Sequence, residues 1–239
     1  MSNKQTDIGV GSVFAAPIAE SSQAFTQSKV PKLGTKVRFD DGREYVFCST
    51  ALDITVGQLV GMAAPSAELA NSCTAAAIGA TSVTIATSTL AANTFADGYL
   101  HIVDDTGTNY TYRIKSHTAG TTTVAAVFTL YDPLIVALDT TSDVVLSPCP
   151  FRSVIVNTAT TVPVGMAVRT TTAATAGVTQ YFWVQTRGAC TLIGTGTLGK
   201  PLHAAAAGAV AVAAADDTNH VGICIQTQAS GEVSAWLQL

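Results

Sequence analysis

Residues 99–114, YLHIVDDTGTNYTYRI, contain two runs of β-branched and aromatic residues separated by the turn sequence DDTG. Aspartate tolerates the bent backbone of a tight turn, and Gly107 accepts a positive φ without steric cost. Side chains alternate between the two faces of a strand, so Tyr110, Tyr112 and Ile114 should share one face of the second run. The stretch therefore predicts a β-hairpin.

From Lys36 onward, nearly every segment has the same character. Short runs rich in β-branched and aromatic residues alternate with turn sequences such as DDG, TAG and ASG. Only the Ala-rich runs near residues 63–78 and 203–215 are ambiguous between strand and helix. Many short strands without intervening helices are typical of sandwiches and barrels. The sequence predicts an all-β fold of antiparallel, sandwich-like or barrel-like modules.

Two weak internal similarities suggest how the modules are arranged. A turn glycine precedes a Tyr-x-aromatic phrase three times, and the phrases TVGQLVGMA and TVPVGMAV share Gly-Met-Ala. The first and third units resemble each other more than the middle one. We therefore expect an outer β module of residues 36–72 plus 151–239, interrupted by an inserted β module of residues 73–150. Residues 1–35 are polar without a sustained period, which predicts an extended N-terminal arm.

The composition limits the kinds of partner that the chain is expected to bind. Charged residues make up only 12% of the 239 residues, and apolar residues make up 48%. Such a low charge fraction predicts a surface covered by copies of the chain or by a larger assembly. The net charge of −4 provides no basic footprint, so we expect no binding to nucleic acid. The start lacks an apolar signal-peptide core, and the most apolar window is too short to span a bilayer, so no membrane is expected.

The cysteines are scattered singly, without a C-x-x-C pair. This pattern argues against a zinc site or a disulfide framework, and favours buried free thiols made in a reducing cytoplasm. The five are Cys48, Cys73, Cys149, Cys190 and Cys224.

Residues 194–199, GTGTLG, match the dinucleotide-binding spacing G-x-G-x-x-G, and Asp216 and Asp217 follow at a suitable distance. That mechanism needs a helix opening at the loop and further βαβ units, which the surrounding sequence does not provide. A turn is the favoured interpretation. Adjacent Asp pairs also lie where turns are expected, and neighbours on an extended chain point apart, so they do not form an acid–base pair. We expect no catalytic residue, cofactor or metal, and no enzymatic activity.

Residues 177–188, GVTQYFWVQTRG, place three aromatic residues side by side in a chain that is only 7% aromatic. In a strand, Tyr181 and Trp183 share one face and Phe182 points to the other. Rings on both faces predict a strand that is covered on both. The simplest version puts Trp183 in the core and Phe182 at a subunit contact, although the sequence is equally compatible with the reverse. Arg187 would be free to pair with a carboxylate of a neighbouring subunit.

Three stretches carry a resemblance to known proteins. FADGYLHIVDDTGTNYTYRIKSHTA, LYDPL and GMAVRTTTAATAGVTQYFWVQTRGACTLI resemble virion structural proteins of tailed bacteriophages. More narrowly, they are similar to head decoration, or cement, proteins. The resemblance implies a non-enzymatic homotrimer that is made in the host cytoplasm and binds the major capsid protein at local three-fold axes outside an icosahedral shell. It assigns no role to any individual residue.

Two alternatives remain open. A carbohydrate-binding or receptor-binding β module of the virion could stack Tyr99, Tyr181, Trp183 or Trp236 on sugar faces. The chain could also be another head or tail subunit. A major capsid protein of the usual tailed-phage fold is disfavoured because it needs a long helix with a sustained period of 3.6 residues, and no such period is found.

Overall fold

The computed structural model describes residues 31–63, 71–213, 220–227 and 231–239. These residues form antiparallel β-sheets with one four-residue α-helix and one 3₁₀ turn, which confirms the all-β prediction. Most of the predicted arm, residues 1–35, lies outside the described residues. No helix among the described residues is long and apolar enough to cross a membrane.

The chain divides into two compact units, with boundaries between Ala63 and Ala64 and between Cys149 and Pro150. Unit 1 comprises the chain before the first boundary and after the second, and unit 2 lies between them. The expected first boundary was after residue 72. In the structure Asn71 and Ser72 instead pair with a strand of unit 2, because Ser72 lies directly opposite Asp143.

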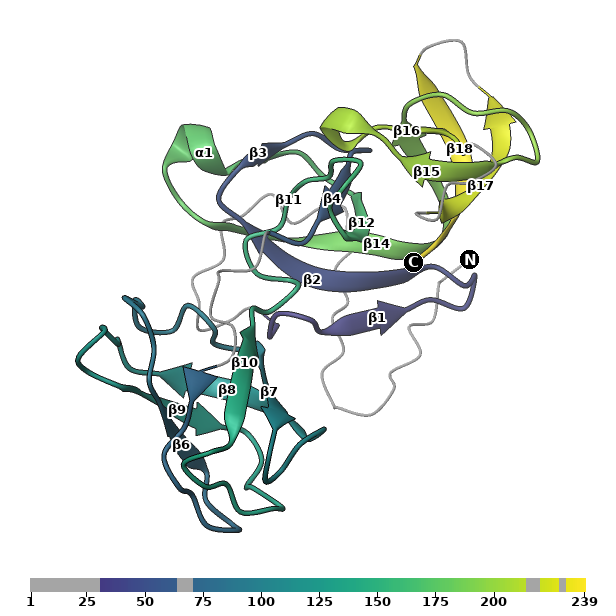
Figure 1. Ribbon diagram of the computed structural model, residues 1–239. Helices are drawn as coiled ribbons and strands as arrows, with labels where there is room; N and C mark the ends of the chain where they lie inside the picture. The colour runs from purple at the N-terminus through teal and green to yellow at the C-terminus, as the bar shows by residue number, and fades with distance from the viewer. Residues whose placement is uncertain (1–30, 64–70, 214–219, 228–230) are drawn as a thin grey trace. The chain divides into compact units, whose positions relative to one another are not determined.

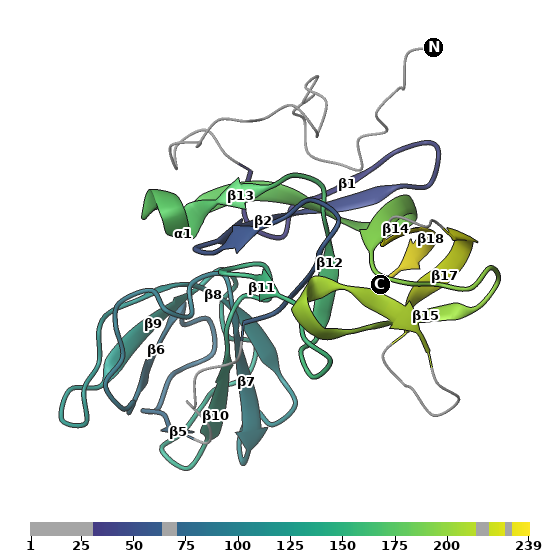
Figure 2. The same ribbon diagram turned by 90° about the horizontal axis from the view of Figure 1, so that it is seen from above.

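Unit 2 is a nearly closed barrel of six antiparallel strands in the order β5-β10-β7-β8-β9-β6 (Figure 2). A bridge between Cys73 and Ile85 joins the two ends of this order. The strands are β5 (Asn71–Ser72), β6 (Ser82–Ile85), β7 (Tyr99–Asp104), β8 (Thr111–His117), β9 (Ala126–Leu130) and β10 (Asp143–Ser147).

The predicted hairpin is confirmed as β7 and β8, in which Leu100 lies directly opposite Tyr112. Tyr112 and Ile114 share one face as expected, and this face points into the barrel. Tyr110 precedes β8 and is exposed, because the turn extends beyond DDTG to the left-handed residue Asn109.

Unit 1 is a half-barrel built on one ten-stranded antiparallel sheet (Figure 1). Its main order is β11-β4-β12-β14-β18-β17-β15-β16, and β2 pairs with β14 and with β1. The strands are β1 (Lys36–Arg38), β2 (Glu44–Thr50), β4 (Leu59–Gly61), β11 (Ile155–Val156), β12 (Pro163–Ala167), β14 (Gln180–Ile193), β15 (Pro201–Ala204), β16 (Val210–Val212), β17 (His220–Thr227) and β18 (Glu232–Gln238).

The remaining elements of unit 1 are short. They are the strands β3 (Asp53–Ile54) and β13 (Thr171–Thr172), which pair with each other, the helix α1 (Ala173–Ala176) and the 3₁₀ turn η1 (Ala206–Gly208). The ambiguous Ala-rich run near 203–215 thus contributes mainly strand to the sheet through β15 and β16, within its described part. A bridge between Gly194 and Val210 brings β16 back to the end of β14.

Two apolar clusters form the core of unit 1, and they cover opposite faces of the same strands. Leu59 of β4 and Met166 of β12 belong to the cluster that also contains Leu192. The next residues along these strands, Val60 and Ala167, belong to the other cluster. Because consecutive strand residues point to opposite faces, this part of the sheet is buried on both sides.

Candidate interaction surface

β14 carries the aromatic phrase QYFWVQTRG, and the chain itself covers the Phe182 face. Phe182 is only 2% exposed and packs in one core cluster with Val184, Val46 and Cys48. Cys48 of β2 lies directly opposite it. The structure therefore contradicts the version that puts Phe182 at a subunit contact, because Phe182 belongs to the core of the protomer.

Tyr181 and Trp183 lie on the other face of β14, and both are half-buried. Each packs against Phe47 of β2. The Tyr181 ring is stacked at 6.1 Å between centroids, and the Trp183 ring meets Phe47 edge-on at 5.1 Å. Phe47 is 1% exposed, so it is the ring that fills the core on this face. Tyr181 and Trp183 therefore share one face of the strand, as expected, but they lie at the edge of the packed core and not inside it.

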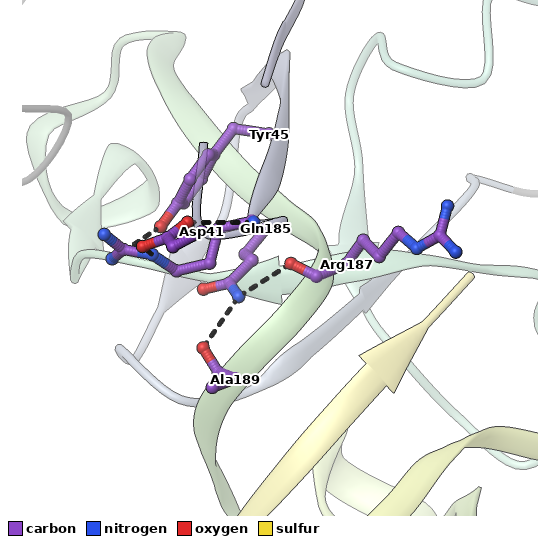
Figure 3. A network of polar contacts seen from close by, with 6 residues as sticks. Asp41, Tyr45, Gln185, Arg187 and Ala189 are labelled. Atoms are coloured by element: carbon purple, nitrogen blue, oxygen red, sulfur yellow. Dashed lines mark hydrogen bonds and ion pairs between the residues drawn. The ribbon is translucent and has the colours of Figure 1, made fainter. Parts of the chain in front are cut away.

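A β-bulge interrupts β14 just after these rings. Gln185 lies opposite Tyr45, whereas Arg187 lies opposite Glu44, so β14 has one more residue than β2 at this point. The buried amide of Gln185 donates hydrogen bonds of 2.9 Å to the carbonyl oxygens of Arg187 and of Ala189 (Figure 3). Because a buried amide without a partner is costly, these two bonds satisfy the Gln185 side chain and stabilise the bulge that redirects the strand.

A hairpin loop packs against the bulge and requires a glycine there. Gly188 has a φ of +92°, and a Cβ at this position would lie 2.9 Å from Cγ of Arg43. The guanidinium of Arg43 is held 2.7 Å from the Asp41 carboxylate, and it donates a 3.2 Å hydrogen bond to the Tyr45 hydroxyl (Figure 3). The backbone N–H of Arg43 and its guanidinium lower the pKa of Asp41 below its ordinary value.

Arg187 leaves the bulge toward solvent and forms an ion pair within its own chain. Its Nη1 lies 3.8 Å from Oε1 of Glu44, and Nε of Arg38 lies 3.6 Å from the same oxygen. Exposed pairs at such distances contribute little to stability. Two arginines thus share one carboxylate, and the adjoining turn adds Asp40, Asp41 and Arg43, so the formal charges of this corner cancel. A carboxylate from a neighbouring subunit remains a prediction for Arg187.

Beyond the bulge, an apolar row crosses four neighbouring strands. Pro201 of β15 lies directly opposite Ile223 of β17, Ile223 lies opposite Trp236 of β18, and Trp236 lies opposite Ala189 of β14. Trp236 is 42% exposed and Ile223 is 49% exposed, and the other two are exposed as well. We call these four residues the Trp236 row.

The opposite face of the same strands explains why the row points outward. Leu192, Cys224, Leu237 and Leu202, which alternate with the row residues, are all buried in one core cluster. The period of two then directs their neighbours to solvent. The Trp236 row is therefore an exposed apolar surface on a rigid sheet, with an aromatic residue near its centre.

Sequence reasoning found Trp236 only as a possible sugar-stacking residue and missed the rest of the row. The alternation in VGICIQ and VSAWLQL indicates which residues share a face within each strand. It does not tell which strands are neighbours or in what register. Only the ladder of the folded sheet places Pro201, Ile223 and Ala189 in line with Trp236.

The residues considered for chemistry take structural roles. Residues 194–199 end in a turn that leads into β15, without a helix, so the turn interpretation is confirmed. Asp40 and Asp41 also lie in a turn, and Asp216 and Asp217 lie outside the described residues. His101 bridges the hydroxyls of Thr111 and Ser147, both at 3.1 Å, across three strands of the barrel. Among the described residues, no group of His, Cys, Asp and Glu side chains could hold a metal ion.

All five cysteines are free thiols, and all but Cys190 are buried. Burial raises the pKa of Cys190 to about 12, and a hydrogen bond from the backbone of Leu237 opposes the shift only in part. Burial also raises the pKa of Cys73. Because the thiolate is the reactive form, both side chains are poor nucleophiles near neutral pH.

Comparisons of the chain with protein-family models, with curated proteins and with solved structures find no match.

Proposed function

We propose that this chain is a non-enzymatic structural protein of a tailed-bacteriophage virion. In this proposal it binds the outside of the capsid, links neighbouring capsomers and acts as a homo-oligomer. The observation that carries the proposal is the Trp236 row, an exposed apolar surface on a rigid β-sheet. The likeness of QYFWVQTRG and YLHIVDDTGTNYTYRI to decoration proteins supplies the assembly to which such a surface would belong.

The chemistry of the surface supports a role in protein association. The centres of protein interfaces are depleted in charged residues and enriched in aromatic ones. The Trp236 row has this composition, and tryptophan is among the residues that most often dominate binding energy at an interface. Because only 12% of its residues are charged, electrostatic repulsion between this chain and a partner should be weak.

A cement protein needs only this kind of surface. Its task is to add binding free energy across the joints of a shell that resists the pressure of packaged DNA. Small and uncharged residues favour close packing against neighbours. The net charge of −4 disfavours binding to the packaged DNA itself.

The test is co-sedimentation of the purified full chain with capsids of the parent phage prepared without this protein. We expect saturable binding with a fixed number of copies per capsid, and no binding to capsids of an unrelated phage. Binding to purified tails but not to capsids would assign the chain to the tail. Failure to bind either particle would contradict the proposal.

A glycan-binding module is the second candidate, because the indole of Trp236 is exposed and has polar neighbours at Ser234 and Gln238. A sugar stacked on this ring would change its fluorescence. Titration with a panel of bacterial surface oligosaccharides distinguishes the two functions. Under the capsid proposal no saturable change is expected, and a saturable change lost in Trp236→Ala but kept in Trp183→Phe would favour the glycan module.

A further inference from the structure

We infer that residues 8–19 of this chain bind the Trp236 row of the same molecule and cover it until a partner displaces them. The inference deepens the proposed function, because it names what occupies the row before the chain meets a capsid. Only the displacement step rests on that function. Occupation of the row by residues 8–19 can be measured without any capsid.

The chemistry of the row calls for an uncharged occupant. Trp236 and Ile223 are 42% and 49% exposed, and none of the four row residues is charged. The next positions along the same face are Thr191 and Ser234, which lie opposite each other and are also uncharged. Within β18 the one charged residue is Glu232, at the first position of the strand. Apolar surface of this kind gains free energy when an apolar group covers it.

The shape of the row fits one extended segment. The row crosses four neighbouring strands, and strands in a sheet lie about 4.8 Å apart, so its length is about 14 Å. Side chains on one side of an extended chain repeat about every 6.8 Å. Three such side chains therefore span the row. Since the row lies on a paired sheet, the occupant has to conform to it.

Residues 8–19, IGVGSVFAAPIA, have the matching composition. They lie between Asp7 and Glu20 and contain no charged residue. Residues 1–30 lie outside the described part of the chain, so their sequence carries this step. Among all residues outside that part, no other run without charge is as long. The large apolar side chains of the segment are those of Ile8, Val10, Val13, Phe14 and Ile18.

The spacing of these side chains agrees with the shape of the row. In an extended conformation Ile8, Val10 and Phe14 share one side of the chain. Gly9 and Gly11 carry no side chain, so the backbone between the apolar residues can approach a flat sheet closely. An extended segment of this kind presents alternate side chains to the surface it binds, as in other modes of peptide recognition.

The segment can reach the row of its own molecule. The N–H of Gly34 donates a 2.9 Å hydrogen bond to the carbonyl oxygen of Phe47, which lies directly opposite Trp183. Ala189, the near end of the row, lies roughly 20 Å further along β14. Residues 20–30 can span about 35 Å when extended, so they can join Gly34 to a segment on the row.

Tethering decides between the segment of the same molecule and that of another copy. A short link gives the bound segment an effective concentration on the order of 1 mM, well above that of a micromolar protein solution. If the separate peptide binds with a dissociation constant of about 100 µM, the row is covered about nine-tenths of the time. A capsid partner that uses the row then binds roughly tenfold more weakly than it would bind the uncovered row.

Acrylamide quenching of Trp236 fluorescence in the full chain tests the inference. Trp183→Phe provides the background, because it leaves Trp236 as the one tryptophan. In this background Ile8→Ser and Phe14→Ser should each raise the quenching constant roughly threefold, because the covering segment is weakened. Phe25→Ser is the matched control, since it makes the same change outside residues 8–19, and it should have no effect. Thermal melting of each variant checks that the fold is kept.

A peptide of residues 5–20 tests the contact directly. Added to the Phe14→Ser chain, it should restore protection of Trp236 with a dissociation constant of about 100 µM. The same peptide carrying Phe14→Ser should not, and Ile223→Ser in the row of the chain should abolish the rescue. Protection in the parent chain should be constant between about 1 and 50 µM protein, because the contact lies within one molecule.

Three results would overturn the inference. Equal quenching of the parent and both segment variants would show that residues 8–19 do not cover Trp236. An equal effect of Phe25→Ser would show that the change is not specific to the segment. Protection that grows with protein concentration would assign the row to a second copy.

Co-sedimentation with capsids separates this inference from the proposed function. Stronger capsid binding by the Phe14→Ser chain than by its parent supports the displacement step. A covered Trp236 in a chain that does not bind capsids contradicts the proposed function alone. Capsid binding by a chain whose segment variants quench like the parent contradicts this inference alone.

Discussion

The backbone N–H of Phe95 donates a 2.9 Å hydrogen bond to Nε2 of His117 inside the barrel of unit 2. The other ring nitrogen, Nδ1, lies 2.8 Å from the carbonyl oxygen of Thr118. A ring that accepts at Nε2 and donates at Nδ1 is a neutral imidazole. The His117 ring also stacks on Phe128 at 4.6 Å and is buried. The core of the barrel therefore contains an uncharged histidine.

This arrangement predicts that acid destabilises unit 2. Burial lowers the pKa of His117 below its ordinary value of 6.5, and the bond to Thr118 opposes the shift only in part. The unfolded chain then binds a proton that the folded chain does not, so the free energy of unfolding falls as pH drops below about 6.5. The free energy of unfolding stops falling with pH once His117 is protonated in the folded state as well.

The measurement is urea unfolding between pH 5 and 8, followed by circular dichroism, for the wild type and for His117→Gln. Glutamine can still accept from Phe95 but does not titrate, so its curve should be flatter in this window. Both proteins keep the other histidines, which therefore cancel in the comparison. Equal slopes for the two proteins would contradict the prediction.

Phe182 should matter more for stability than the larger ring beside it. Phe182→Ala removes a buried ring and leaves a cavity, which costs about 3–5 kcal/mol. Trp183→Ala removes a half-buried ring and should cost about half as much, because less apolar surface is lost. Urea unfolding monitored by circular dichroism measures both, with the exposed Val162→Ala as a control expected within about 0.5 kcal/mol of wild type. A larger cost for Trp183→Ala would restore the sequence-based assignment.

Gly188 should be less replaceable than another glycine with similar backbone geometry. Gly188 and Gly42 have φ values of +92° and +85°, but a Cβ at Gly42 meets nothing within 4 Å, whereas at Gly188 it would lie 3.0 Å from the Cα of Arg43. Alanine at either position should cost about 1–2 kcal/mol for the left-handed backbone. Gly188→Ala should cost about 1–3 kcal/mol more, because the hairpin loop must move. Thermal melting of the two variants isolates this steric contribution, and equal melting temperatures would show that the loop yields freely.

Cys190 should be slow to react in the folded protein although it is partly exposed. With its pKa raised from 9.0 to about 12, its thiolate is scarce at pH 8, and alkylation by iodoacetamide should be roughly 1,000-fold slower than in urea. Mass spectrometry of partially labelled protein locates the modified thiols, and Cys190→Ser identifies the corresponding peptide. Since folding raises this pKa, the thiol's contribution to stability should be full below its ordinary pKa of 9.0 and should be lost as pH rises above it. Rapid native labelling of Cys190, or a native crosslink between any two cysteines, would contradict the prediction.

Local patterns in the sequence are sufficient to specify the class of the fold and its local elements. In the hairpin, the turn residues DDTG and the alternation of Tyr112 and Ile114 specify a strand pair, because side-chain period and turn chemistry are local properties of the chain. The same reasoning correctly predicted a turn at residues 194–199, because a nucleotide-binding loop needs a helix that the following residues do not form. It also determined that Tyr181 and Trp183 share one face of β14 and that Phe182 occupies the other.

Which of those faces is the core depends on packing between strands that are distant in the sequence. Either face of a strand with large residues on both sides could be the buried face. Which face is buried depends on the residues that pack against it. Cys48 and Val46 of β2 place Phe182 inside. The bulge at Gln185 could not be predicted either, because it depends on the register between β14 and β2. The Trp236 row follows the same logic, since Pro201, Ile223, Trp236 and Ala189 become neighbours only through the pairing of strands far apart in the sequence.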